Sequence, residues 1–181
     1  MQNIILIDLE ATCCDKDEFP KEDMEIVEIG AVAVIDGKIH SEFEIVVCPT
    51  KKGNINAFLE QLTGLTKERV ERGVGFIYAL NEFTSWVNPY LYGNFDINGW
   101  GSWGHYDKNQ FQKDFNRFSI QTPSLFRKDH RNIKNEFKDK FGKRCGVQKA
   151  LAMIGETFEG NHHRALDDTK NIFKLYRALY E

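Results

Sequence analysis

The feature that most restricts the fold of this chain is a short apolar run near its N-terminus that ends in acidic residues. Residues 4–7 are isoleucine or leucine, and Asp8 and Glu10 follow at once. A continuous run this short predicts a strand over residues 4–8 that is buried on both faces at the centre of a sheet. Alternate residues of an extended chain share a face, so Asp8 and Glu10 are expected to point to one site at the carboxyl end of that strand.

A β-hairpin and a series of helices are expected after this strand. Residues 25–35 are rich in β-branched side chains, Asp36-Gly37 is a strong turn signal, and residues 38–47 return as a third strand. Another strand is expected between residues 90 and 103. Helical spacing of apolar residues predicts helices over 56–62, 66–72, 76–87, 107–118, 133–141, 147–154 and 165–179. The pattern indicates an α/β fold, and a length of 181 residues suits a single domain over residues 1–181.

Composition restricts the class of protein further. No apolar run approaches the roughly 20 residues that a membrane span needs, and the N-terminus has no basic leader, so no membrane association is expected. The four cysteines match no zinc-binding spacing, which favours reduced thiols and a cytoplasmic location. A net charge of −3 argues against a module that holds nucleic acid by phosphate neutralisation alone. It is compatible with carboxylates that hold cations, which in turn meet phosphate.

Residues 161–171 carry two acids and two histidines close to the last expected helix. On that helix Asp168 falls at the edge of the apolar face, whereas Asp167 falls on the opposite side. A carboxylate turned toward the core is costly unless it is paired or bound to metal, so Asp168 is the candidate ligand. His163 would lie in the loop or first turn before the helix, where a neutral imidazole can accept a proton from water. By composition alone, His162 is nearly as good a candidate.

A further acid follows the glycine-rich segment 99–104. Asp107 suits the first turn of a helix, and a helix-capping role would suffice to explain it. Asp96 is an alternative that the pattern leaves open.

Taken together, these motifs resemble the DEDDh family of 3′→5′ exonucleases, which is named for four acids and a histidine. Within it, the chain is most similar to the exoribonucleases that trim histone-mRNA ends and small interfering RNAs. The similarity runs through nearly the whole chain, in the right order. It comprises Asp8-Leu9-Glu10-Ala11-Thr12-Cys13, Glu25-Ile26-Val27-Glu28-Ile29-Gly30, Leu62-Thr63-Gly64-Leu65-Thr66, Ser102-Trp103-Gly104-His105-Tyr106-Asp107, Asn132-Ile133-Lys134 and His163 with Leu166-Asp167-Asp168-Thr169-Lys170-Asn171-Ile172.

The resemblance implies an RNase H-like fold, in which helices flank a five-stranded mixed sheet. It also implies a catalytic set in which His163 is the general base and two Mg²⁺ or Mn²⁺ ions are held by Asp8, Glu10, Asp107 and Asp168. It thereby selects Asp107, Asp168 and His163 over their rivals. Two such ions, about 3.5–4 Å apart, stabilise the attacking and leaving oxygens of a phosphodiester. The expected reaction removes nucleoside 5′-monophosphates from the 3′ end of single-stranded RNA or DNA.

Substrate contacts are expected from five further residues. By resemblance, Phe58 and Leu65 match positions that wedge the terminal base, although core packing explains them equally well. Tyr106 adjoins a metal ligand, and Ala11 and Thr12, with Glu10, can contact the terminal sugar through the backbone. Two alternative functions are a nucleic-acid-binding module without catalysis and a hydrolase of short oligonucleotides.

Overall fold

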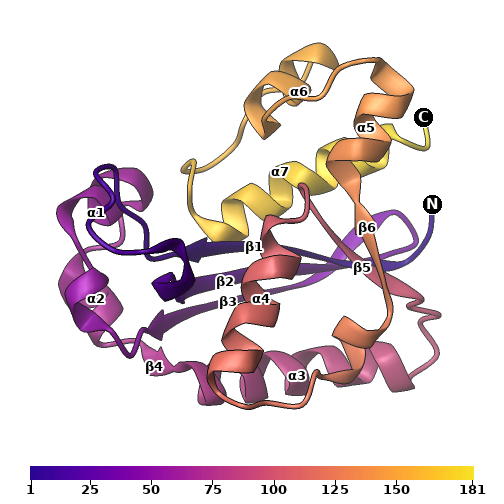
Figure 1. Cartoon of the computed structure of the whole chain (residues 1–181). Coiled ribbons are helices and arrows are strands. Elements are labelled where there is room, and N and C mark those ends of the chain that lie inside the picture. The colour runs from indigo at the N-terminus through magenta and orange to yellow at the C-terminus, as the bar shows by residue number, and fades with distance from the viewer.

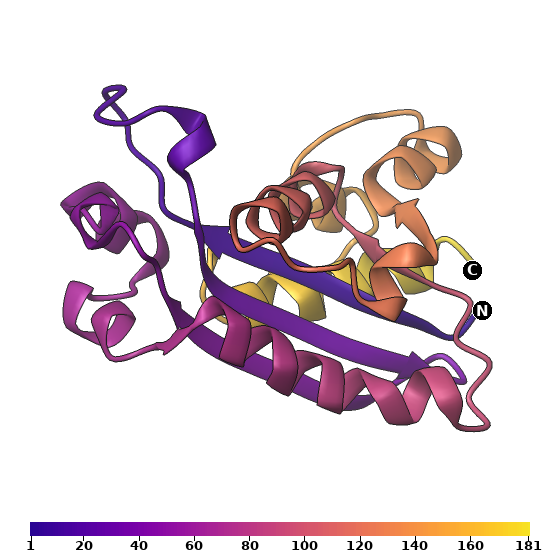
Figure 2. The same ribbon diagram turned by 60° about the horizontal axis from the view of Figure 1, so that its bottom comes forward.

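The computed structural model describes residues 1–181 as a mixed sheet between two layers of helices (Figure 1, Figure 2). The six strands are β1 (Ile4–Ala11), β2 (Ile26–Ile35), β3 (Lys38–Cys48), β4 (Val74–Gly75), β5 (Gly99–Ser102) and β6 (Asp129–Asn132). The seven α-helices are α1 (Ala57–Thr63), α2 (Lys67–Glu71), α3 (Phe76–Tyr92), α4 (Tyr106–Arg117), α5 (Ile133–Phe141), α6 (Val147–Met153) and α7 (Ala165–Ala178).

The first strand lies inside the sheet, as the apolar run predicts. The strand order is β4-β3-β2-β1-β5-β6. β1 pairs antiparallel with β2 and parallel with β5, while β5 pairs parallel with β6. The β2–β3 hairpin turns at Asp36 and Gly37, both with positive φ, as a tight turn of this kind requires. The carboxyl ends of β1, β5 and β6 therefore meet at one edge of the sheet, where open sheets bind ligands.

The predicted α/β class and the RNase H-like sheet are confirmed, with two differences in detail. The sheet has six strands rather than five, because the two residues of β4 pair with the end of β3. The polar segment Asp129–Asn132 forms β6 although its sequence has no strand pattern. It is extended because it pairs with β5 along its whole length, which is a tertiary effect that no local pattern contains.

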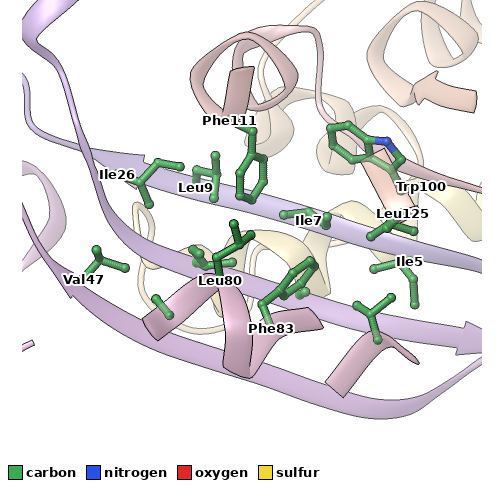
Figure 3. Packing of buried hydrophobic residues seen from close by; sticks show 14 of the residues in the cluster. Ile5, Ile7, Leu9, Ile26, Val47, Leu80, Phe83, Trp100, Phe111 and Leu125 are labelled. Carbon is green, nitrogen blue, oxygen red and sulfur yellow. The ribbon is translucent and has the colours of Figure 1, made fainter. Parts of the chain in front are cut away.

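The two faces of β1 bury two separate cores. Ile5, Ile7 and Leu9 belong to a cluster that includes side chains of α3 and α4, and Figure 3 shows them facing Leu80, Phe83 and Phe111. Ile4 and Leu6, on the other face, belong to a cluster with α5, α6 and α7. Asp8 and Glu10 continue the Ile4–Leu6 face, so they emerge on the side of the sheet that α7 covers.

Helix α7 approaches the sheet closely at Gly30 of β2. A side-chain carbon at this position would overlap the backbone of Ala165, the first residue of α7. Glycine therefore allows the N-terminal end of the helix to lie directly on the strand next to β1. Since Gly30 is the cross-strand partner of Asp8, this contact brings the first turn of α7 over the acidic end of β1.

None of the helices combines the length and the apolar character that crossing a bilayer requires. All four cysteines are unpaired, as the sequence suggests for thiols.

Candidate active site

Asp8, Glu10 and Asp168 come together where the first turn of α7 lies over β1. One carboxylate oxygen from each lies within 4.8 Å of the others, although the residues come from two elements far apart in the chain. One oxygen of Asp168 accepts a hydrogen bond from the backbone N–H of His163 at 2.7 Å, which fixes the carboxylate. Asp167 is turned away and accepts from the N–H of Asn161 at 2.8 Å. The cluster thus contains Asp168 and not its neighbour.

Both histidines lie beside this cluster. The Nδ1 atom of His163 is 3.8 Å from Oε1 of Glu10, and the Nε2 atom of His162 is 4.0 Å from Oδ1 of Asp168. His163 adopts a left-handed backbone conformation with φ 63°, which is uncommon for a residue other than glycine. That conformation turns the chain just before α7 begins and brings the imidazole back toward Glu10.

Asp107 borders the same site but is held differently. It lies in the first turn of α4, where the positive end of the helix dipole favours a carboxylate. Its Oδ1 accepts a hydrogen bond from the backbone N–H of Leu9 at 3.1 Å, so the side chain is tied to β1 between the two acids of that strand. Asp107 is not part of the close group of three carboxylates. Asp96, its rival in the sequence, is held by Asn98 in a loop and lines no part of the site.

The four acids share an unfavourable electrostatic environment. Burial, reinforced by the neighbouring carboxylates, raises the pKa of Asp8 well above its usual range. Burial is also the main reason that the pKa values of Asp107 and Asp168 rise to about 6 and that the pKa of Glu10 is raised. The carboxylate of Glu10, which faces the ring, raises the pKa of the His163 imidazole. Negative charge is therefore concentrated here beyond what the protein itself neutralises.

This donor set suits hard divalent cations. Mg²⁺ and Mn²⁺ prefer carboxylate oxygens, and a bound cation would offset both the burial and the repulsion that together raise the four pKa values. Asp8, Glu10 and Asp168 are placed to share an ion, and Asp107 stands beside them as a further oxygen donor.

The acids and both histidines line a cleft of ≈ 360 Å³. Ala11 and Tyr106 line it as well, and Tyr106 is 48% exposed at its rim. The cleft therefore has carboxylates at its base and an aromatic ring at its edge. Its other apolar walls are formed by Leu9, Cys13, Leu62, Trp103 and Val147.

Three of the expected substrate contacts lie outside this cleft. Leu65 is completely buried in a small core with Val27, Ile55, Leu59 and Val70. Thr12 is also completely buried, and its hydroxyl accepts a hydrogen bond from the N–H of Glu25. Phe58 is half-buried one turn before Leu62 on α1 and does not line the cleft. The expectation that Leu65 wedges a base is not compatible with its burial.

Leu62, rather than Leu65, lines the cleft where an apolar contact with the substrate was expected. Helix α1 ends at Thr63, and Gly64, which caps it with a φ of 70°, reverses the chain, so the leucines on either side of this turn point to different places. Leu62, before the turn, reaches the cleft, whereas Leu65, after it, enters the core. Both leucines flank the same Thr63-Gly64 pair, and only the reversal at Gly64 separates their roles.

Comparison with known proteins identifies the family. Residues 5–176 match the model of an exonuclease family, RNase_T. The chain belongs to this exonuclease family. It is 28% identical to the 3′-5′ exonuclease Snipper of Drosophila melanogaster, over 95% of this chain and 67% of that protein. It is 27% identical to ERI1 exoribonuclease 2 of Xenopus laevis, over 95% of this chain but 27% of that protein.

Solved structures show the same fold. The nuclease domain of 3′hExo, a DEDDh family member whose structure contains rAMP, superposes with a TM-score of 0.88 and 24% identity, over 99% of this chain and 92% of that one. The predicted relationship to exonucleases is confirmed by the family model, and the likeness to 3′hExo confirms that the chain shares the fold of a DEDDh family member.

Proposed function

We propose that this exonuclease removes nucleotides one at a time from the 3′ end of single-stranded RNA or DNA, using two Mg²⁺ or Mn²⁺ ions held by Asp8, Glu10, Asp107 and Asp168. The observation that carries the proposal is the convergence of carboxylates from β1 and α7 within 4.8 Å, beside two histidines and in an open cleft. The family membership supports the reaction class.

The acids and the histidine have different roles in the proposed reaction. When bound, the divalent ions would supply positive charge to the attacking and leaving oxygens of the phosphodiester. Asp8, Glu10 and Asp168 set the position of that charge. The Leu9 N–H holds Asp107 beside them. His163, made more basic by Glu10, accepts the proton of the attacking water. The product is a nucleoside 5′-monophosphate, and the rAMP in the 3′hExo structure is a molecule of this kind.

His163→Ala is expected to lower kcat by about 10²- to 10⁴-fold, because it removes the proposed general base. Mn²⁺ affinity should change little, since the carboxylates remain. Single-turnover cleavage and manganese titration would measure the two effects. His162→Ala provides a comparison, because both rings line the cleft but only His163 faces Glu10. A larger loss of kcat in His162→Ala than in His163→Ala would reassign the base.

The apolar wall at Leu62 and the exposed ring of Tyr106 give the terminal nucleotide surfaces on which to stack. Leu62→Ala is expected to raise KM by about tenfold with little loss of stability, because burying a leucine side chain under the terminal base would contribute about 1.5–3 kcal/mol. Leu65→Ala is the matched comparison. It should lower the free energy of unfolding by about 2–5 kcal/mol because it opens a cavity in the core, and KM of the folded protein should be unchanged. A reversal of the two phenotypes would return the wedge to Leu65.

The direct test of function uses purified protein, Mn²⁺ and 5′-labelled single-stranded RNA. A ladder that shortens from the 3′ end, with release of 5′-monophosphates, is the expected result. Binding without shortening would favour the alternative of a nucleic-acid-binding module. Cleavage limited to dinucleotides or trinucleotides would favour a hydrolase of short oligonucleotides. A parallel assay with DNA of the same sequence would define the sugar preference.

The four free thiols suit the reducing cytoplasm, which we propose as the location.

A further inference from the structure

Glu28 of β2 is a buried acid that lies beside the site without lining the cleft. It is 0% exposed and is the cross-strand partner of Glu10. Directly opposed residues of an antiparallel pair share a face, so Glu10 on β1 and Glu28 on β2 lie side by side on the same face of the sheet. Like charges in this arrangement destabilise the sheet, and a buried carboxylate is costly unless it is paired. The pairing of Glu28 therefore requires an explanation.

The segment between His163 and α7 provides that pairing. Arg164 donates to Glu28 from Nε at 3.1 and 3.2 Å and from a terminal nitrogen at 2.7 Å, and the same terminal nitrogen donates to Glu44 of β3 at 2.9 Å. The backbone N–H of Ala165 donates to Glu28 at 2.9 Å. Glu28 thus accepts hydrogen bonds from the side chain of one residue and from the backbone N–H of the next.

Two consecutive residues of this segment contact two glutamates that are themselves cross-strand partners. His163 faces Glu10 on β1, and the next residue, Arg164, faces Glu28 on β2. The chain from 163 to 165 therefore crosses from one strand to its neighbour, and α7 then begins on Gly30. Because His163 is in a left-handed conformation, its backbone needs support from the surrounding structure. The contacts of Glu28 with Arg164 and with the N–H of Ala165 provide that support from the neighbouring strand.

We propose that Glu28 is a positioning residue, which holds His163 over Glu10 by anchoring Arg164 and the first amide of α7 to β2. It touches no substrate and no reacting atom, and the proposal rests on the proposed function only in taking His163 as the proton acceptor. Displacement of a positioned group by about 1 Å can cost about 10²-fold in rate. Loss of the anchor should therefore appear in the chemical step and leave substrate binding unchanged.

The test is a double-mutant cycle between Glu28 and His163, with single-turnover rates as the readout. Glu28→Gln keeps the size of the side chain and an acceptor oxygen but removes the charge that holds Arg164. In the wild-type background it is expected to lower kcat by about 10- to 100-fold with KM and Mn²⁺ affinity changed less than about twofold. In a His163→Ala background the same change should have no further effect on kcat, because the positioned group is gone. An equal loss of kcat in both backgrounds, or no loss in either, would overturn the proposal.

Glu25→Gln is the matched control. Glu25 is also a buried glutamate, one residue before β2, and it accepts hydrogen bonds from Thr50 and Lys51 at 2.8–2.9 Å, with no contact to the His163 segment. Both substitutions should lower the melting temperature, because each weakens the hydrogen bonds of a buried carboxylate, but Glu25→Gln should leave kcat unchanged. Arg164→Lys keeps the charge but loses the paired nitrogens, so it provides a milder second variant if Glu28→Gln fails to fold. It should couple to His163→Ala in the same sense, and additive losses would contradict the anchor.

A readout without catalysis separates this proposal from the proposed function. In a crystal structure of Glu28→Gln, the anchor predicts that the His163 Nδ1 to Glu10 Oε1 distance increases from 3.8 Å while Asp8, Glu10 and Asp168 stay in place. An unchanged imidazole would overturn the positioning role even in an active enzyme. Absence of exonuclease activity in the wild type, with the imidazole displaced in the variant, would instead refute the proposed function alone.

Discussion

Asp8→Asn is expected to lower exonuclease activity by about three orders of magnitude and, at the same time, to stabilise the metal-free protein. The activity falls because Asp8 is the acid that faces all the others, so its loss disturbs the charge that acts on the reacting phosphate. The stability rises because the substitution removes one of several like charges held close together. The pKa of Asp8 is raised first by burial and then by Asp107, Asp168 and Glu10.

Opposite effects on activity and stability distinguish a functional acid from a structural one. Rates of 3′ shortening in Mn²⁺ and melting temperatures in EDTA would be measured for the same preparation. Asp96→Asn is the control, because Asp96 is in a loop outside the cleft and should change neither quantity by much. If Asp8→Asn instead lowered the melting temperature in EDTA while activity persisted, Asp8 would be a structural residue.

The second large effect is the dependence of metal stabilisation on pH. Asp107 and Asp168 have pKa values of about 6, above the unfolded value of about 3.9. Carboxylates shifted in this direction stabilise the metal-free fold at low pH, and that contribution is lost as pH rises through about 6. Cations bind the deprotonated form, so they restore stability where the carboxylates are charged.

Saturating Mn²⁺ should therefore raise the melting temperature by roughly 5–10 °C at pH 7.5, which corresponds to an ion concentration of about 100 times Kd. At pH 5.5 the increase should be clearly smaller, because protons compete for the same oxygens. Differential scanning calorimetry with Mn²⁺ or EDTA at each pH would measure it. An increase that is equal at both pH values, or that persists in Asp8→Asn, would contradict metal binding by these carboxylates.

Strand and helix periodicity predicted the elements that carry the acids. The two-residue spacing of Asp8 and Glu10 on a buried strand predicted one shared face, and the structure has both carboxylates in one cluster. The apolar face of the last helix separated Asp168 from Asp167, and only Asp168 lies in the cluster. Local patterns suffice here because each choice depends on which face of one element is buried.

The features that depend on tertiary contacts were not predictable in this way. The reversal at Gly64 decides between Leu62 and Leu65, and both leucines fit the same motif. The polar strand β6 exists because β5 pairs with it. Glu28 is the single charged residue of an otherwise apolar strand, and the role that we propose for it depends on a contact with Arg164, 136 residues away in the chain. The left-handed conformation of His163 was likewise not predictable, because histidine adopts positive φ more often than most residues but still only in a minority of cases.

The most direct test of the central claim is anomalous X-ray diffraction from crystals soaked in Mn²⁺. We expect manganese peaks between the carboxylates of Asp8, Glu10 and Asp168, within reach of Asp107 and next to the ring of His163. Manganese that is found only elsewhere on the surface, with these four acids unoccupied at neutral pH, would contradict the proposed mechanism.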